Sequence, residues 1–313
     1  MCANSIRKKI SLVIPIFNEE ENIVMLYERL EAIIINWPEY DWEYLFINDG
    51  SGDASWSLIK QLSVGNSSIK GVSFSRNFGY QMALTAGHDY AQGDAVITLD
   101  ADLQDPPELI HEMIRQWQNG YDIVYGKRSS RSDGFIKDIT AHYYYIFLSL
   151  VSVVAIPRNV GDFRLLDKKV VFVIRQCKEF DRYWRGLVAW TGFTYKMLKF
   201  VRPERNAGET SYTWKKLMKL AFDGITSFSL FPLQLAFYAS VLVIGSAFLM
   251  LLYMVYDISV GTGVYPLYKW LFVCIYLNMG MQFMLLWFVG RYVGSFYSVQ
   301  KGRPAYIIED HLQ

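Results

Sequence analysis

Residues that form disulfides or bind zinc are scarce in this chain of 313 residues. It has three cysteines and four histidines, and none of them has the spacing of metal ligands. Cys2, Cys177 and Cys274 lie far apart and form no CxxC pair, so the sequence indicates neither a disulfide framework nor a zinc site and fits a reducing compartment. The net charge is only +1, which argues against electrostatic binding of nucleic acid.

Common nucleotide-binding motifs are also missing. No GxGxxG follows the first predicted strand, so a dinucleotide-binding fold is not supported. The stretch from Gly120 to Arg128 resembles a P-loop only superficially, because five residues separate its glycines and Arg128 stands where a Ser or Thr would bind magnesium. A basic start followed by strand-like ISLVIP predicts no signal peptide.

Charge is absent from two long stretches near the C-terminal end, residues 224–256 and 270–290. A membrane-spanning helix needs about 20 apolar residues, so both stretches are long enough. We therefore expect a two-helix transmembrane hairpin within 224–313, ending in a short cytoplasmic tail; the alternative is a pair of buried core helices. Basic residues on the outer flanks predict a multi-pass protein of the inner membrane, with residues 1–223 and both termini in the cytoplasm.

Polar residues inside the second stretch raise the question of association. Asn278 and Gln282 stand four residues apart and so share one helix face. In lipid they would seek hydrogen-bond partners, which favours a homo-oligomer through the transmembrane helices, although simple tolerance of two polar residues explains them equally well. The apolar run 143–156 is shorter and fits an interfacial helix or a buried core helix.

The first 128 residues alternate between strand and helix patterns. Strands are expected at residues 10–15, 42–48, 69–75, 94–99 and 121–126, and helices at 19–35, 55–63, 81–90 and after the prolines at 106–107. Asn18 and Asp53 are candidate helix caps. This alternation predicts an α/β fold with a mostly parallel sheet that is covered on both faces.

Polar side chains follow the predicted strands, where ligands bind in such sheets. Asp100 and Asp102 come directly after the strand at 94–99. Two carboxylates on a rigid edge suit a hard cation such as Mg²⁺ or Mn²⁺, which also coordinates phosphate oxygens. A lone DxD is a weak motif, and polar loops at strand ends are common, but its place in the α/β pattern strengthens it.

Longer stretches carry a family resemblance. The sequence resembles the family-2 inverting glycosyltransferases with the GT-A fold, a Rossmann-like α/β fold, and within them the polyprenyl-phosphate sugar transferases, which include the bactoprenol glucosyltransferases and dolichyl-phosphate mannose synthase. The matching stretches are SLVIPIFNEEENI, FINDGSGDAS, SFSRNFGYQMALTAGHDYAQGD, DADLQDPPELI, NVGDFRLLDKKVV, RGLVAWTGF, ERNAGETSY, GITSFSLFPL and KGRPAYII.

The resemblance implies roles for individual residues. The implied donor-binding residues are Pro15, Phe17, Asn18, Glu19, Asp49, Ser51, Asp100, Ala101 and Asp102. The implied catalytic residues are Asp100, Asp102, Gln104, Arg128 and Arg205; Asp100 and Asp102 would also hold the metal, and Arg128, Arg164 and Arg205 would meet the acceptor phosphate. Asn48, Ser211 and Arg291 depart from residues common in the family, and Ser211 puts one phosphate contact in doubt.

The resemblance also implies a reaction. A hexose would pass with inversion from a nucleotide-diphosphate sugar, with UDP-glucose as the best candidate, to undecaprenyl phosphate at the membrane. The polyprenyl-phosphate-hexose would serve cell-surface glycan modification, such as that of the O-antigen of lipopolysaccharide. The alternatives are a mannose or N-acetylhexosamine synthase, a processive polysaccharide synthase, whose Gln-x-x-Arg-Trp element is absent, or a non-catalytic membrane scaffold.

Overall fold

The computed structural model describes residues 7–128, 157, 160–177, 182–200, 267–300 and 302–312, and nine separate positions between 238 and 260. The strands are β1 Lys8–Ile16, β2 Tyr40–Asn48, β3 Ile69–Phe74, β4 Ala95–Thr98, β5 Ile123–Arg128, β6 Val160–Asp167, β7 Tyr195–Phe200 and β8 Ile308–Leu312. The helices are α1 Ile23–Ile34, α2 Ser55–Ser63, α3 Tyr80–Tyr90, the short 3₁₀ helix η1 Pro107–Leu109, α4 Ile110–Gln118, α6 Lys168–Gln176, α7 Trp184–Trp190 and α10 Leu267–Gln300.

One sheet organises the part of the chain that contains the predicted site. Its strand order is β7-β5-β6-β4-β1-β2-β3-β8. Strand β1 pairs in parallel with β2 and β4, β2 pairs in parallel with β3, and β5 pairs in parallel with β7. The predicted alternation of strands and helices, and the mostly parallel sheet, are therefore confirmed.

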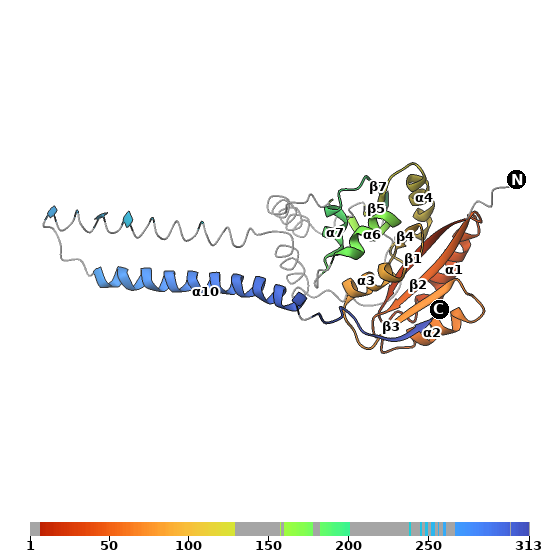
Figure 1. Ribbon diagram of the computed structural model, residues 1–313, viewed down its shortest axis with the longest axis horizontal. Helices are drawn as coiled ribbons and strands as arrows, with labels where there is room; N and C mark the ends of the chain where they lie inside the picture. Colours follow the sequence, from red (N-terminus) through yellow and green to blue (C-terminus); the bar gives the residue numbers. More distant parts are fainter. Residues whose placement is uncertain are drawn as a thin grey trace. The chain divides into compact units, whose positions relative to one another are not determined.

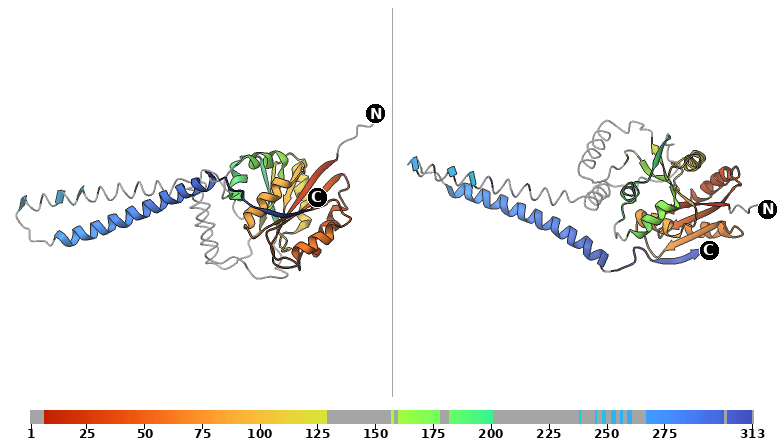
Figure 2. Two further views of the ribbon diagram at one scale, coloured as in Figure 1. Left: turned by 60° about the horizontal axis from the view of Figure 1, so that its bottom comes forward. Right: turned by 45° about the horizontal axis from the view of Figure 1, so that its top comes forward.

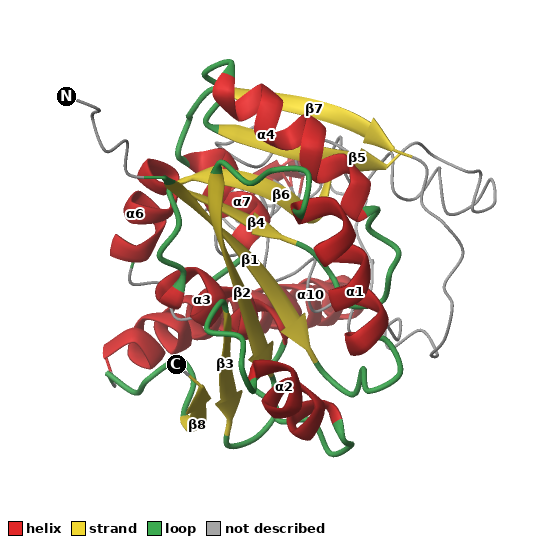
Figure 3. Cartoon of the chain, turned by 90° about the vertical axis from the view of Figure 1, so that its right-hand side faces the viewer, coloured by secondary structure: helices red, strands yellow, loops and turns green. Residues whose placement is uncertain are grey.

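Helices cover both faces of this sheet. Figure 3 shows α1 and α4 on one side of the strands and α3 and α6 on the other. The first face packs Leu26 and Met113 against strand residues such as Leu12. On the second face α3 lies close to β1, since a Cβ at Gly87 would come within 2.1 Å of Val13 Cγ1. Burial on both faces explains why the central strands read as nearly continuous apolar runs.

Strand β6 is the element that the sequence pattern does not reveal. It lies between β4 and β5 and runs antiparallel to both. Its register places Arg164 opposite Thr98 near the end of β4. A segment that is about sixty residues further along the chain is thereby brought to the strand end that carries Asp100.

The last strand returns to the sheet. Strand β8 pairs antiparallel with β3, and the C-terminus lies beside the sheet in both views of Figure 2. Trp56 donates its indole N–H to Asp310 at 3.1 Å, and the ring of Tyr306 stacks on Phe74 at 4.9 Å. Residues Pro304–Gln313 accordingly cluster with Met1–Ala221, while Phe222–Arg303 form a second compact unit that contains α10, blue in Figure 1. The functional division at residue 223 stays a prediction.

Neither of the two predicted cap residues occupies the N-cap position of its helix. Helix α1 begins at Ile23, with Asn22 at its N-cap position. Asn18 instead adopts a left-handed conformation with φ of 55°, and its amide oxygen accepts the Gly52 N–H at 2.9 Å. The cap prediction for Asn18 is wrong because a tertiary contact with the next loop claims its side chain. Ala54 holds the N-cap position of α2, and Asp53, one residue earlier, accepts the Ser55 N–H at 3.0 Å.

The membrane prediction requires correction. Within the described ranges, the structure contains no helix that combines the length and the apolar character needed to cross a bilayer. The predicted multi-pass inner-membrane location is contradicted by this finding, and the transmembrane hairpin, with the homo-oligomer and orientation deduced from it, is unsupported. The expectation rested on the absence of charge from residues 224–256 and 270–290, and the second of these stretches lies within α10. Most of residues 224–256 and all of 143–156 lie outside the described residues.

Candidate active site

Three parallel strands end at the same edge of the sheet, and their loops are tied to one another. After β1, the Asn18 N–H donates to Ser51 Oγ at 3.0 Å, and the Glu19 N–H donates to Ser55 Oγ at 3.0 Å. These bonds join the loop after β1 to the loop after β2. The structure therefore brings together the residues predicted from the two stretches FNEE and NDGS.

Asp49 holds a third loop. Its buried carboxylate accepts the N–H groups of Phe78 at 2.7 Å and Gly79 at 3.0 Å. Burial raises the pKa of Asp49 to about 6, although these donors and Arg76 favour the ionised form. Gly50, with φ of 64°, lets the backbones pack closely, because a Cβ there would lie 2.3 Å from the Arg76 carbonyl carbon.

Asp100 begins the loop after β4 and is held from two sides. The Tyr80 hydroxyl donates to Asp100 Oδ1 at 2.7 Å, and the Asp100 N–H donates to the buried Asp105 at 3.3 Å. Burial, with the charges of Asp100 and Asp162, raises the pKa of Tyr80, so the hydroxyl remains a donor. Tyr80 follows Gly79 directly, so the hydrogen bonds run from Asp49 through this loop to Asp100.

Asp102 lies deeper in the same loop. Its side chain is 6% exposed, and its Oδ1 accepts the Gln104 N–H at 3.1 Å. Leu103, between them, has a positive φ of 59°, an uncommon conformation for a residue with a branched side chain. The loop thus bends tightly around Asp102 and keeps its carboxylate at a defined place beside Asp100.

Sequence reasoning missed two charged residues at this edge. Asp162 on β6 lies, by continuation of the strand register, opposite Asp100. Its carboxylate accepts from Arg164 Nη2 at 2.6 Å and from Arg185 Nη2 at 2.8 Å. Asp162 and Arg185 both fall inside stretches that carried the family resemblance, NVGDFRLL and RGLVAW, which were the only signals that could have found them.

The other predicted site residues differ in how far they are buried and in whether the structure describes them. Pro15 and Ala101 are buried, whereas the Phe17 side chain is 46% exposed at the end of β1. Arg164 is fully buried. The backbone of Arg128 ends β5, but its side chain lies outside what the structure describes, as does all of Arg205.

The carboxylates at this edge suit a metal that a ligand helps to bind. Among the described residues, no three His, Cys, Asp or Glu side chains come together as a metal site of their own. Mg²⁺ is commonly bound by one or two carboxylates, with phosphate oxygens and water completing its shell. Asp100 and Asp102, on one short loop, match that donor set.

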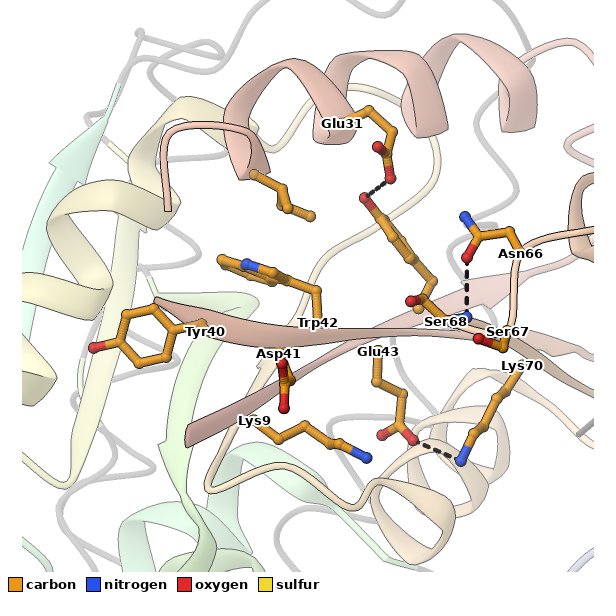
Figure 4. A pocket seen from close by; sticks show the side chains of 12 residues that line it. Lys9, Glu31, Tyr40, Asp41, Trp42, Glu43, Asn66, Ser67, Ser68 and Lys70 are labelled. Atoms are coloured by element: carbon orange, nitrogen blue, oxygen red, sulfur yellow. Dashed lines mark hydrogen bonds and ion pairs between the residues drawn. The ribbon is translucent and has the colours of Figure 1, made fainter. Parts of the chain in front are cut away.

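A separate pocket of about 480 Å³ lies at the opposite ends of the strands. Figure 4 shows its side chains, among them Lys9, Trp42, Glu43 and Lys70, with an ion pair between Glu43 and Lys70. Lys9 is seven residues before Ile16 on β1, so at about 3.3 Å per residue the two ends are about 23 Å apart. This pocket therefore contains none of the aspartates described above.

Known proteins resemble this chain, and two of them do so over nearly its whole length. The family described as "Glycosyl transferase family 2" matches residues 11–186. "Bactoprenol glucosyl transferase" of Shigella phage SfV is 42% identical, covering 97% of this chain and 99% of its own. "Uncharacterized glycosyltransferase YkcC" of Bacillus subtilis is 43% identical, covering 96% of this chain and 93% of its own. The solved glucosyl-3-phosphoglycerate synthase from Mycobacterium tuberculosis in complex with Mn²⁺, UDP-glucose and phosphoglyceric acid has 19% identity and a TM-score of 0.46, with 70% of this chain and 78% of that chain covered.

Proposed function

Because the chain belongs to glycosyl transferase family 2 and is a glycosyltransferase, we propose that it transfers glucose from UDP-glucose to a polyprenyl phosphate. The observation that carries this proposal is the 42% identity with a bactoprenol glucosyl transferase over nearly the full length of both chains. The loops at the ends of β1, β2 and β4 are the proposed place for a nucleotide-diphosphate sugar.

The nucleotide is proposed to lie over the ends of β1 and β2. Phe17 offers an exposed ring there, and Pro15 lies before it, near the end of β1. Asn18, Glu19 and Ser51 belong to the two loops that the Asn18 to Ser51 hydrogen bond joins. Asp49 is proposed to orient the base, because its carboxylate fixes the loop of Phe78 and Gly79 at the same place.

The diphosphate is proposed to lie over the loop after β4, with Ala101 at its floor. Asp100 and Asp102 would hold a divalent ion, and that ion would supply charge compensation for the departing diphosphate. The Tyr80 hydroxyl holds Asp100 in place, and the Gln104 N–H does the same for Asp102, while the Gln104 side chain is proposed to orient the sugar. Preorganised carboxylates of this kind lose little free energy in reorganisation when the ligand arrives.

The acceptor needs no strong general base. A phosphate monoester has a second pKa of about 6, so its oxygen is already an anion near neutral pH. That oxygen attacks the anomeric carbon, the bond from this carbon to the diphosphate breaks, and UDP leaves with the electron pair. Attack from the opposite face inverts the anomeric centre. Arg128 and Arg205 are proposed to bind the acceptor phosphate, since a guanidinium donates two parallel hydrogen bonds to it. Arg164 is fully buried, so it is proposed to act only indirectly, through its hydrogen bond to Asp162.

The test uses the purified full-length chain. It is incubated with undecaprenyl phosphate in detergent and, separately, with labelled UDP-glucose, UDP-galactose, GDP-mannose and UDP-N-acetylglucosamine. We expect a lipid carrying one hexose from UDP-glucose, identified by mass spectrometry. A polymer would favour a processive synthase, a product only from another sugar would correct the donor, and no product with any donor would overturn the proposal.

The metal assignment has its own test. Asp102→Ala, and separately removal of divalent ions with EDTA, should abolish transfer and leave the free energy of unfolding nearly unchanged. Asp41→Ala, which removes an exposed carboxylate at the start of β2, is the matched control and should keep full activity. Activity that survives EDTA in the wild type would contradict the role of the metal.

A further inference from the structure

Three charged side chains between β6 and α7 form a cluster that the DxD region does not include. Asp162 binds Arg164 through Oδ1 at 2.6 Å and Arg185 through Oδ2, with Arg185 Nη2 at 2.8 Å and Nε at 3.2 Å. The side chains of Arg164 and Asp162 are 0% and 4% exposed, whereas that of Arg185 is 30% exposed. Arg185 is thus the member of the cluster that a ligand can reach.

The charges of this cluster do not cancel. Arginine stays protonated in proteins, so the formal charges of Asp162, Arg164 and Arg185, taken by themselves, sum to +1. Within the described residues, Nε and Nη1 of Arg164 have no hydrogen-bond partner. Buried donors without partners are costly, and a buried ion pair is weak evidence for stabilisation. The cluster is therefore better explained by its effect on a nearby anion.

The register of β6 places this cluster beside the proposed donor site. Thr98 pairs with Arg164, so Asp162 falls two residues further along, opposite Asp100. The charges of both Asp100 and Asp162 act on Tyr80, whose hydroxyl donates to Asp100. Asp162 and Asp100 accordingly lie close to one hydroxyl group.

We propose that Arg185 binds a substrate phosphate group and that Asp162 and Arg164 are positioning residues, which hold its guanidinium in place. The inference rests on the proposed function, because that function brings two phosphate-bearing groups to this edge, the diphosphate of the donor and the monophosphate of the acceptor. Both present the same chemistry to a guanidinium, and the experiment distinguishes them.

The variants are Arg185→Gln, Arg185→Lys and Asp162→Asn, with Arg115→Gln as the matched control. Arg115 is an exposed arginine on α4 that pairs with Glu112 at 3.1 Å, so its replacement removes the same charge at a residue with no proposed role in binding. Calorimetric titrations of the full chain with UDP, uridine and inorganic pyrophosphate measure the donor arm. The KM for undecaprenyl phosphate measures the acceptor arm, and thermal unfolding measures folding.

In Arg185→Gln we expect either the affinities for UDP and pyrophosphate to fall, or the KM for the acceptor to rise, by about tenfold or more, the usual effect of one charge-assisted hydrogen bond. Uridine affinity and the melting temperature should match those of Arg115→Gln. Asp162→Asn should weaken the same arm less, and Arg185→Lys should recover part of the loss, since it keeps the charge without the planar fork.

Two results would overturn the inference: no change in either arm for Arg185→Gln, or an equal loss for uridine and UDP. If the wild-type protein binds pyrophosphate but not UDP, UDP-glucose is rejected as the donor. The pyrophosphate titrations of wild type and Arg185→Gln would still show whether Arg185 binds phosphate. The two proposals can therefore fail separately.

Discussion

Asp49 should make the stability of this protein depend on pH in a way that one substitution reveals. Its carboxylate is 3% exposed, and burial raises its pKa from 3.8 to about 6. A change of that size corresponds to about 3 kcal/mol, at about 1.36 kcal/mol for each pKa unit. This is the free energy that the folded protein loses by keeping Asp49 ionised.

The direction follows from the two pKa values. Because the folded pKa lies above the unfolded one, the contribution of Asp49 to stability is fully present below pH 3.8 and is lost as the pH rises through about 6. The side-chain amide of the Asp49→Asn variant does not titrate, so the difference between the two proteins isolates this group. Between about pH 7.5 and about pH 4.5, the wild type should gain about 2 kcal/mol relative to Asp49→Asn.

Urea denaturation followed by circular dichroism, in EDTA and without nucleotide, gives the free energy of unfolding of both proteins at both pH values. A difference between them that stays constant within about 0.5 kcal/mol, an error typical of extrapolation to water, would refute the assignment of a raised pKa to Asp49. If the Asp49 carboxylate also accepts a hydrogen bond from the base, UDP affinity should fall below about pH 6 in the wild type only.

Three further outcomes are expected. Gly50→Ala should lose about 1–3 kcal/mol of stability and weaken UDP binding, since φ is 64° and the new Cβ would lie 2.3 Å from the Arg76 carbonyl carbon; unchanged denaturation and calorimetry would contradict this. Burial lowers the pKa of His88 to about 3, so the wild type should lose stability relative to His88→Gln as the pH falls from about 6.5 toward about 3, and a flat difference would disprove it. Asp310→Ala should lower stability by about 1 kcal/mol by removing the acceptor of Trp56. Lys60→Ala breaks an exposed ion pair and a cation–π contact with Trp56 at 5.6 Å but leaves the indole hydrogen bond intact, so it should change stability less; equal effects would show that the indole bond is unimportant.

The family assignment and the DxD region were accessible from the sequence because their residues are close together along the chain. Asp100, Asp102 and Gln104 occupy one loop, and the strand before them is recognisable as a buried apolar run. The proximity of Asp49 to Asp100 was also predictable in outline, since parallel strands end at one edge of a sheet. The hydrogen bonds through Gly79 and Tyr80 that connect Asp49 with Asp100 could not be predicted from the sequence.

Two expectations failed for a shared reason. Asn18 was expected to cap a helix by its own position in the sequence, but the Gly52 N–H of another loop takes its amide oxygen. The charge-free run in α10 was interpreted from composition alone, and the finding on the described helices does not support a span. Both inferences were drawn from short stretches of sequence. Whether Asn18 caps a helix depends on its hydrogen bond to another loop, and whether a helix can cross a membrane depends on the length and apolar character of the whole helix.

The chain by itself determined the alternation of strands and helices and the acidic loop after β4, because periodicity and short motifs express interactions between near neighbours. The family was identified from the resemblance of longer stretches to known sequences. Only the tertiary structure decided that β6 inserts antiparallel beside β4 and that β8 returns to β3. These pairings join residues far apart in sequence, and no local pattern encodes their register. That is why Asp162 became visible opposite Asp100, and Arg185 as the partner of Asp162, only once the sheet was assembled.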